Sequence, residues 1–180
     1  MKDMCCIDAF SPTSSSEIKA YFMENLKPIM DENRDIIFLF IGTDRSTGDS
    51  LGPLIGYKLK SIISKKLYIY GSLESPIHAT NILTILDKIK ANFNNPYIVA
   101  IDAALGSVNN IGKVIIENKP LAPGAAFNKS LPAIGNMSIK GIVNISGGMD
   151  FTLLQNTRLY TVMTLADSIS NGISLFSKSV

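Results

Sequence analysis

Three short apolar runs constrain the fold of this chain more than any other feature. They occupy residues 35–42, 67–70 and 96–102, and the stretch from Ile36 to Ile41 holds only apolar side chains. Runs rich in β-branched and aromatic residues are typical of strands that are covered on both faces. Helical patterns separate the three runs, so the sequence predicts right-handed strand-helix-strand crossovers and parallel pairing.

The predicted helices begin at recognisable signals. A capping-box pattern at 14–17 opens an amphipathic helix that ends within residues 28–33. A proline in the first turn marks two further helices, one opening at 52–53 and one at 75–76. Asp150 can cap a long last helix.

The pattern changes in the last third of the chain. Residues 113–118 and 138–145 read as strands, and the Pro- and Gly-bearing segment 120–132 between them suits an ordered surface loop, so a mixed sheet is expected here. Residues 1–13 show no periodicity and are predicted to form a flexible leader, which leaves residues 14–180 as one domain.

Composition excludes several classes of protein. The chain has 17 basic and 15 acidic residues with no basic cluster, which argues against a nucleic-acid face or a polybasic membrane anchor. No apolar run approaches the roughly 20 residues that span a bilayer, and no signal core follows the N-terminus, so a soluble cytoplasmic protein is expected. Cys5 and Cys6 are neighbours without zinc-type partners; they indicate a reducing compartment and are predicted tail residues.

Two aspartates follow different predicted strands. Ligands of open α/β sheets bind beyond the carboxyl ends of the strands, and Asp49 and Asp102 both belong to loops at that edge. Two carboxylates held together there repel, so the pair retains one proton and can activate water. The alternative interpretations are a helix cap for Asp49 and an ordinary turn carboxylate for Asp102.

Other chemistry is weakly supported in the same loops. His78 is the only histidine, and we predict it in the first turn of a helix, either as a base or contact near the acid pair or as a solvated or capping residue. Asp44 and Arg45 read as a surface ion pair. The loop after Gly42 has neither P-loop nor Gly-x-Gly-x-x-Gly spacing, and the chain has no Gly-x-Ser-x-Gly, so phosphate binding and serine hydrolysis are not indicated.

These residues resemble a known superfamily. Gly-Asp-Ser-Leu-Gly-Pro at 48–53 and Ile-Asp-Ala-Ala-Leu at 101–105 look like the two aspartate motifs of the germination protease, which degrades small acid-soluble proteins of bacterial spores. Their order is also similar to that in hydrogenase maturation endopeptidases. Over residues 35–176, including Gly-Ser-Leu-Glu-Ser-Pro-Ile-His-Ala at 71–79, the chain resembles the YyaC-like sporulation family, described as spore proteases.

The resemblance implies a three-layer α/β/α sandwich with a mostly parallel, mixed central sheet of the phosphorylase/hydrolase-like type. It also implies an aspartic-type peptidase with Asp49 and Asp102 as its catalytic pair. We expect loop amides near Gly42 and Gly106 to stabilise the oxyanion and His78 to line the substrate site. No histidine follows Asp102, so the nickel site of the hydrogenase endopeptidases is not expected, nor is any other metal or cofactor.

The expected partner is a protein or peptide substrate, for example a small acid-soluble spore protein in the forespore or spore core, with no nucleic acid and no membrane. Two alternatives remain open: a non-catalytic binding or regulatory module that keeps the fold, and a hydrolase acting on a small molecule or nucleoside through the same acids.

Overall fold

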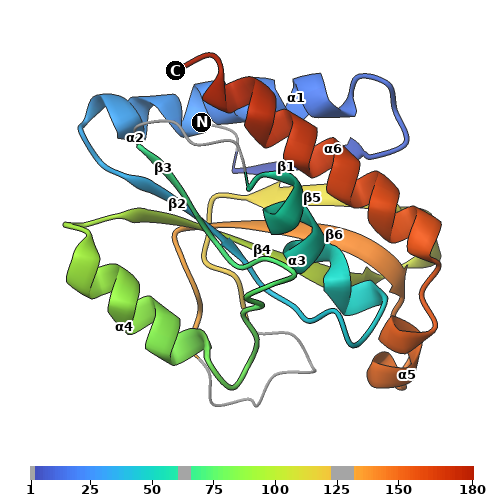
Figure 1. Cartoon of the computed structure of the whole chain (residues 1–180). Coiled ribbons are helices and arrows are strands. Elements are labelled where there is room, and N and C mark those ends of the chain that lie inside the picture. The colour runs from blue at the N-terminus through green and yellow to red at the C-terminus, as the bar shows by residue number, and fades with distance from the viewer. Residues whose placement is uncertain (1–2, 61–65, 123–131) are drawn as a thin grey trace.

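A mixed six-stranded sheet forms the centre of the molecule (Figure 1). The computed structural model describes residues 3–60, 66–122 and 132–180. The strand order is β1-β5-β6-β4-β2-β3, with parallel pairing from β3 through β2 and β4 to β6 and antiparallel pairing of β5 with both β6 and β1. The strands are β1 (Met4–Asp8), β2 (Ile36–Phe40), β3 (Leu67–Tyr70), β4 (Tyr97–Gly106), β5 (Lys113–Glu117) and β6 (Met137–Ile145). The predicted mixed sheet is confirmed.

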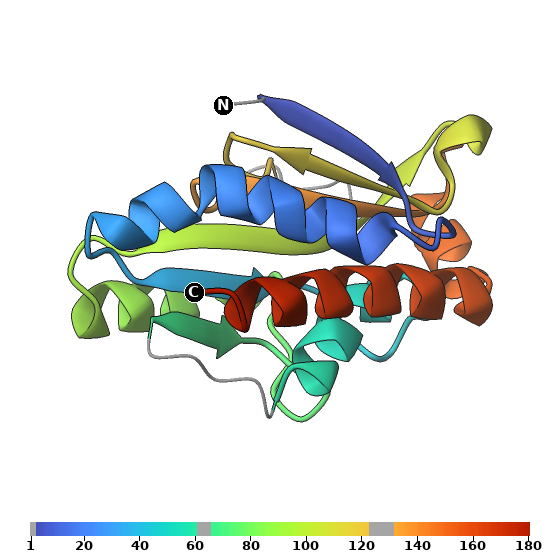
Figure 2. The same ribbon diagram turned by 90° about the horizontal axis from the view of Figure 1, so that it is seen from above.

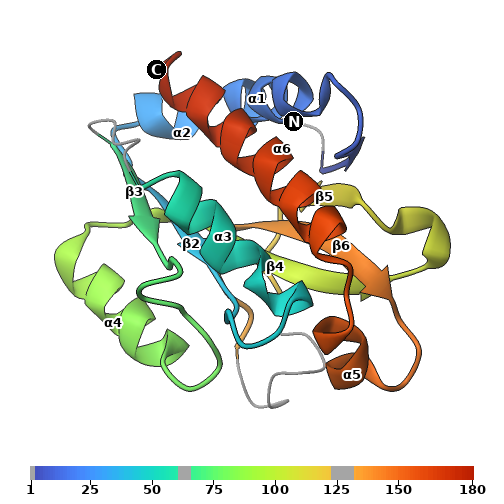
Figure 3. The same cartoon turned by 45° about the vertical axis from the view of Figure 1, so that its right-hand side comes forward.

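Helices cover both faces of the sheet, so the predicted three-layer arrangement is also confirmed. On one face, α1, α3 and α6 pack over the larger core, whereas α4 covers the other face (Figures 1 and 3). Figure 2 shows α1 and α6 running side by side. The helices are α1 (Ser14–Asn25), α2 (Lys27–Asp31), α3 (Leu51–Lys58), α4 (Ile82–Asn92), α5 (Asp150–Gln155) and α6 (Leu159–Ser177), with 3-10 turns η1 (Gly48–Ser50) and η2 (Val108–Asn110).

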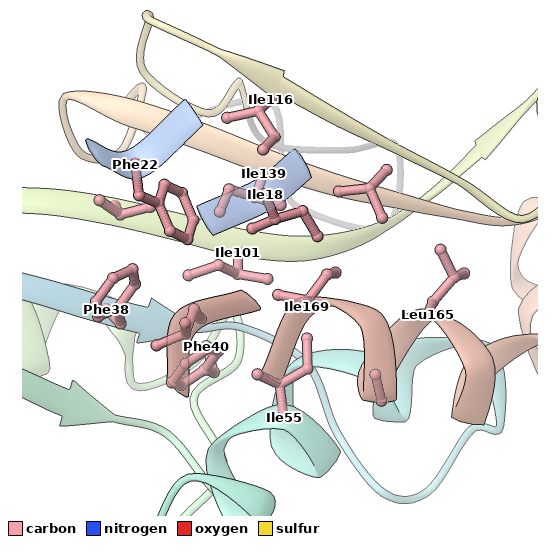
Figure 4. Close-up of a cluster of buried hydrophobic side chains, with 14 of the residues drawn as sticks. Ile18, Phe22, Phe38, Phe40, Ile55, Ile101, Ile116, Ile139, Leu165 and Ile169 are labelled. Atoms are coloured by element: carbon pink, nitrogen blue, oxygen red, sulfur yellow. The ribbon is translucent and has the colours of Figure 1, made fainter. Parts of the chain in front are cut away.

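The larger core lies between the sheet and the layer formed by α1, α3 and α6. Phe22 of α1 contacts Phe38 of β2 and Phe176 of α6, with ring centroids 5.9 and 5.6 Å apart, and all three rings are fully buried (Figure 4 shows the first two). Burying one such side chain contributes about 1.5–3 kcal/mol. This apolar contact fixes the strands that carry the candidate site.

Part of the predicted leader is ordered, which corrects the expectation for residues 1–13. Met4–Asp8 forms the edge strand β1, whose Ile7 lies opposite Val114 and is 1% exposed. Cys5 packs partly against the core and Cys6 is exposed. A five-residue edge strand with one fully buried apolar residue gives almost no alternation in the sequence, so pairing with β5 decides its structure.

The third predicted helix begins later than its proline signal suggested. Ile77 forms an isolated parallel bridge with Ile41, and α4 starts only at Ile82, so His78 lies in the preceding loop and not in a helical turn. The side-chain oxygen of Asn81 accepts a 2.9 Å hydrogen bond from the His78 amide. Tertiary pairing with the residue after β2 has therefore displaced the helix start.

Three further boundaries differ from expectation. The first helix has Thr13 as its N-cap, and the Thr13 hydroxyl donates to Glu17 in place of the predicted capping box. The long last helix is divided into α5 and α6. Most of the predicted loop at 120–132 lies outside the described residues.

Within the described ranges, no helix is both long enough and apolar enough to cross a membrane.

Candidate functional site

Asp49 is held at the carboxyl edge of β2 by a tight return of the chain. After Gly42 the loop folds back so that the Thr43 amide donates a 3.0 Å hydrogen bond to the Asp49 carbonyl. Gly42 has φ +138°, and a Cβ there would lie 2.0 Å from the Asp49 carbonyl oxygen. Only glycine permits this approach, so the motif places an acid beside the strand end.

Asp102 lies inside β4, which corrects the expectation that it terminates a strand. β4 continues to Gly106 because residues 103–106 pair with β6. β2, however, ends at Phe40, which lies opposite Ile101, so Asp102 is one residue beyond the end of its neighbouring strand. Its side chain is 6% exposed, and its Oδ1 accepts a 2.8 Å hydrogen bond from the Ala103 amide.

The two carboxyl groups influence each other electrostatically. Burial raises the pKa of Asp102 well above its usual range, the negative charge of Asp49 raises it further, and the Ala103 amide opposes both effects. Burial also raises the pKa of Asp49, against a hydrogen bond from the Thr43 backbone and the positive charge that His78 can carry. Both pKa shifts therefore favour the protonated acid, and the shift is the stronger one at Asp102.

A cleft of about 340 Å³ opens beside Asp49. It is lined by Gly42, Thr43, Arg45, Ser46, Asp49, His78, Ala79, Phe151, Leu154 and Gln155. Asp49 and His78, predicted from different loops, therefore face one cavity. A second cleft of about 470 Å³ shares Thr43, Arg45 and His78 with the first, and there the His78 Nδ1 and the Thr80 hydroxyl share a 2.9 Å hydrogen bond.

The two predicted oxyanion positions do not match the geometry. The Gly42 amide already donates a 2.7 Å hydrogen bond to the Ile77 carbonyl, so this glycine lines the cleft without offering a free donor. Gly106 is not among the cleft residues; it is four strand positions beyond Asp102, about 13 Å along the sheet. Gly106 is instead tied to the loop after β6, since its carbonyl accepts from the Ser146 amide at 2.8 Å.

Several cleft residues had no usable sequence signal. Phe151 and Leu154 of α5 form an apolar wall, and Phe151 remains 67% exposed. α5 is attached to β6 by the side chain of Asn144, whose Nδ2 donates a 3.0 Å hydrogen bond to the Leu153 carbonyl. The helix start at Asp150 was visible in the sequence, but its position beside residues 42–49 depends on that long-range contact.

Two polar groups in the cleft were also missed. Ser46 is 9% exposed, and its hydroxyl has no hydrogen-bond partner among the described residues. Arg45 is exposed and lines both clefts, and within the described part of the chain no salt bridge joins it to Asp44, contrary to the predicted surface pair. The Arg45 side chain is therefore available to a bound molecule, whereas the Ser46 hydroxyl is buried.

The donor set does not fit a metal ion. Among the residues that the structure describes, no three His, Cys, Asp or Glu side chains gather closely enough to hold one.

Comparison with solved structures supports the fold. The chain is similar to the [NiFe] hydrogenase maturation protease HycI from Thermococcus kodakarensis KOD1, with a TM-score of 0.57 and 18% sequence identity over 80% of this chain and 92% of that one. The match extends to the mixed central sheet and its flanking helices, so the predicted protease-like fold is confirmed.

Sequence comparison gives nearer relatives. The chain is 45% identical to Uncharacterized protein YyaC from Bacillus subtilis strain 168, over 146 residues that make up 81% of this chain and 71% of that protein. Residues 8–172, which include both aspartates, the histidine and α5, match one family model. The chain therefore belongs to the family described as Protein of unknown function (DUF1256).

Proposed function

We propose that this protein is an aspartic-type peptidase of sporulating bacteria that cleaves a spore protein. The observation that carries the proposal is the electrostatic pairing of Asp49 and Asp102 beside an open cleft. The similarity of the fold to that of a maturation protease supports a role of this pair in peptide hydrolysis. Small acid-soluble spore proteins are the proposed substrates, and the forespore or spore core is the proposed location.

The two acids have different tasks in the proposed reaction. Asp49 faces the cleft and is the more readily ionised, so its carboxylate takes a proton from water as the water oxygen attacks the peptide carbonyl carbon. Asp102 is buried, stays protonated and thereby keeps a second negative charge away from Asp49. When the C–N bond breaks, the proton on Asp49 passes to the leaving amine.

The developing negative charge needs a donor that the glycine amides do not supply. Arg45 and His78 line the same cleft as Asp49, and among the described residues no carboxylate forms an ion pair with Arg45. We assign oxyanion stabilisation to these two side chains.

The test is direct cleavage. Purified protein is incubated with small acid-soluble spore proteins and with a random peptide library from acidic to neutral pH, and products are identified by mass spectrometry. Asp49→Asn and Asp102→Asn are compared with Asp44→Asn, an exposed acid in the same loop. Cleavage by the wild type and by Asp44→Asn, but by neither site variant, supports the peptidase.

No cleavage by a folded wild-type protein under any condition would overturn the proposal. The favoured alternative would then be a non-catalytic binding or regulatory module, in which the same cleft recognises a polypeptide without turnover.

A further inference from the structure

Large apolar side chains are exposed together at one end of the molecule. Phe10 lies in the turn after β1, Met149 and Phe151 lie at the start of α5, and Leu159 and Tyr160 begin α6. Their exposed fractions lie between 47% and 68%. Figures 1 and 3 show α5 and the first turns of α6 at this same end. We call these five residues the α5–α6 patch.

Contacts between distant segments hold the patch in place. The rings of Phe10 and Tyr160 lie with their centroids 5.9 Å apart, although they come from opposite ends of the chain. The guanidinium of Arg158 lies 5.5 Å from the centroid of the Tyr160 ring. Only residues 156–158 separate α5 from α6, so Phe151 and Tyr160 belong to adjoining elements.

The patch exposes a large apolar area. A large side chain offers about 150–200 Å² of surface, so the exposed fractions leave on the order of 500 Å² in contact with water. The largest apolar patch of a typical monomer covers about 300–600 Å² and is often functional. A patch of this size therefore indicates a partner.

Size and position favour the substrate protein as that partner. A standard protein interface buries about 800 Å² on each side and a permanent dimer buries more, so the patch alone is too small for a permanent dimer. Phe151 also lines the cleft of Asp49, and the patch therefore continues the candidate site. Patch and cleft together approach the area that one bound protein covers.

The residue types of the patch suit a protein partner. Phe, Tyr, Met and Arg are enriched in the centres of protein interfaces. Arg158 is exposed and, within the described part of the chain, forms no salt bridge, so its donors are available at the margin of the patch. A lipid surface is less suited, because the chain has no cluster of basic residues to bind anionic headgroups.

We propose that the α5–α6 patch is a docking surface for the protein substrate and binds an apolar segment of that protein outside the Asp49 cleft. The inference rests on the proposed function and adds to it a preference for whole proteins over short peptides. Apolar side chains of the substrate cover Leu159 and Tyr160, and Phe151 joins the docking surface to the cleft.

Binding is measured without cleavage in the Asp49→Asn background. The double variant Leu159→Ser/Tyr160→Ser is titrated with a small acid-soluble spore protein and with a pool of random 20-residue peptides. We expect about 10- to 100-fold weaker binding than in Asp49→Asn alone, because a few central side chains carry most of the binding free energy of an interface. The matched control Tyr57→Ser/Leu83→Ser removes the same side-chain types, 52% and 49% exposed on α3 and α4, and should bind within about 2-fold.

A second variant keeps the test valid if the double variant does not fold. Met149→Ser changes a side chain that is 68% exposed just before α5, and it should weaken binding about 3- to 10-fold. Equal binding by the patch variants and the control would overturn the proposal. So would a failure of both probes to bind Asp49→Asn.

Cleavage separates docking from a general structural effect. In the active protein, Leu159→Ser/Tyr160→Ser should lower kcat/KM for a spore protein about 10-fold relative to kcat/KM for a short peptide that contains the same bond, through a higher KM. An equal loss on both substrates would assign these residues a structural role and overturn docking.

The docking surface and the peptidase can fail independently. If the patch variants lose binding but the wild type cleaves neither substrate, the docking surface stands and the peptidase falls. If the wild type cleaves, and the patch and control variants bind and cleave alike, the peptidase stands and the docking surface falls.

Two further measurements address other occupants of the patch. A dimer in sedimentation velocity that Leu159→Ser/Tyr160→Ser dissociates would assign the patch to a second copy of this chain. Co-sedimentation with vesicles of phosphatidylglycerol and phosphatidylcholine that the same variant loses would assign it to a membrane. Either result would overturn substrate docking.

Discussion

The carboxyl groups in the two halves of the sheet have opposite pKa shifts. In the parallel half, burial raises the pKa of Asp49 and Asp102. In the antiparallel half, hydrogen bonds from Lys119 and Lys140 lower the pKa of Glu117, with N–O distances of 2.7 and 2.8 Å. Protonation of the carboxyl group is thus favoured at Asp49 and Asp102, whereas ionisation is favoured at Glu117.

The difference follows from topology. Parallel strands bring their carboxyl ends to one edge, where loops can place two acids together with no lysine between them. In the antiparallel pair, Lys140 of β6 lies beside Glu117 of β5 and neutralises it on the sheet surface. Position in the sheet, and not residue type, separates an acid suited to chemistry from one that forms a surface ion pair.

The largest expected effect is on cleavage. Asp49→Asn and Asp102→Asn should each lower kcat/KM by about 10²- to 10⁴-fold, because the general base or the protonation state of the pair is lost. Glu117→Gln, in the other half of the sheet, should leave kcat/KM within about 2-fold of the wild type. Steady-state kinetics on one cleaved peptide measures all three. Equal losses of kcat/KM in the three variants would show that the acids of the parallel half have no special role in cleavage.

The next effect concerns the backbone that presents Asp49. A Cβ on Gly52 would lie 2.1 Å from the Ile41 carbonyl oxygen, so Gly52→Ala should destabilise the fold by about 3 kcal/mol. Gly147→Ala is the matched control, because its Cβ would meet only a side-chain atom at 3.8 Å. Its free energy of unfolding should change by less than about 1 kcal/mol. Urea unfolding measures the free energy of unfolding of both variants. Similar values for the two would contradict the close packing around Gly52.

A third effect is a change in the pH dependence of stability. A raised pKa means that folded Asp102 still holds a proton at pH values where the unfolded chain has released it, so this group's contribution to stability falls as pH rises through that range. Asp102→Asn cannot titrate. Its stability should therefore depend less on pH above about 4 and should equal or exceed that of the wild type at neutral pH.

Thermal unfolding across pH 4–8 measures this slope. A variant that is less stable than the wild type at neutral pH, with an unchanged slope, would show that the buried acid is not the source of the pH dependence.

The smallest effect belongs to the antiparallel half. Glu117→Gln should cost about 0.5–1 kcal/mol at neutral pH, because it removes a partly exposed ion pair with two lysines. The pH dependence is opposite to that of Asp102. Because the pKa of Glu117 is lower in the folded protein than in the unfolded chain, its ionised form stabilises the fold above the unfolded-state pKa, and this contribution is lost as pH falls. The stability difference between wild type and variant should therefore vanish in acid, and its persistence there would refute the ion-pair explanation.

Sequence reasoning worked where the signal was local and failed where it was not. The apolar run from Ile36 to Ile41 predicts a buried strand, and the structure has β2 at Ile36–Phe40. Ser75-Pro76 is a strong local start signal and predicts a helix at His78, yet Ile77 pairs with Ile41 and the helix starts later. The sequence predicts Gly106 in a loop beside the acids, but pairing with β6 extends β4 past Asp102 to Gly106.

The sequence by itself determined the strands of the parallel half, the layer architecture and the two acids with the glycines that surround one of them. These depend on side-chain burial and on backbone conformations that neighbouring residues dictate. Tertiary structure alone decided that Met4–Asp8 forms the strand at one end of the sheet and that α5 lines the cleft. Each of these depends on which distant segment supplies the pairing partner, and hydrogen bonds and packing between distant segments leave no periodic trace in the chain.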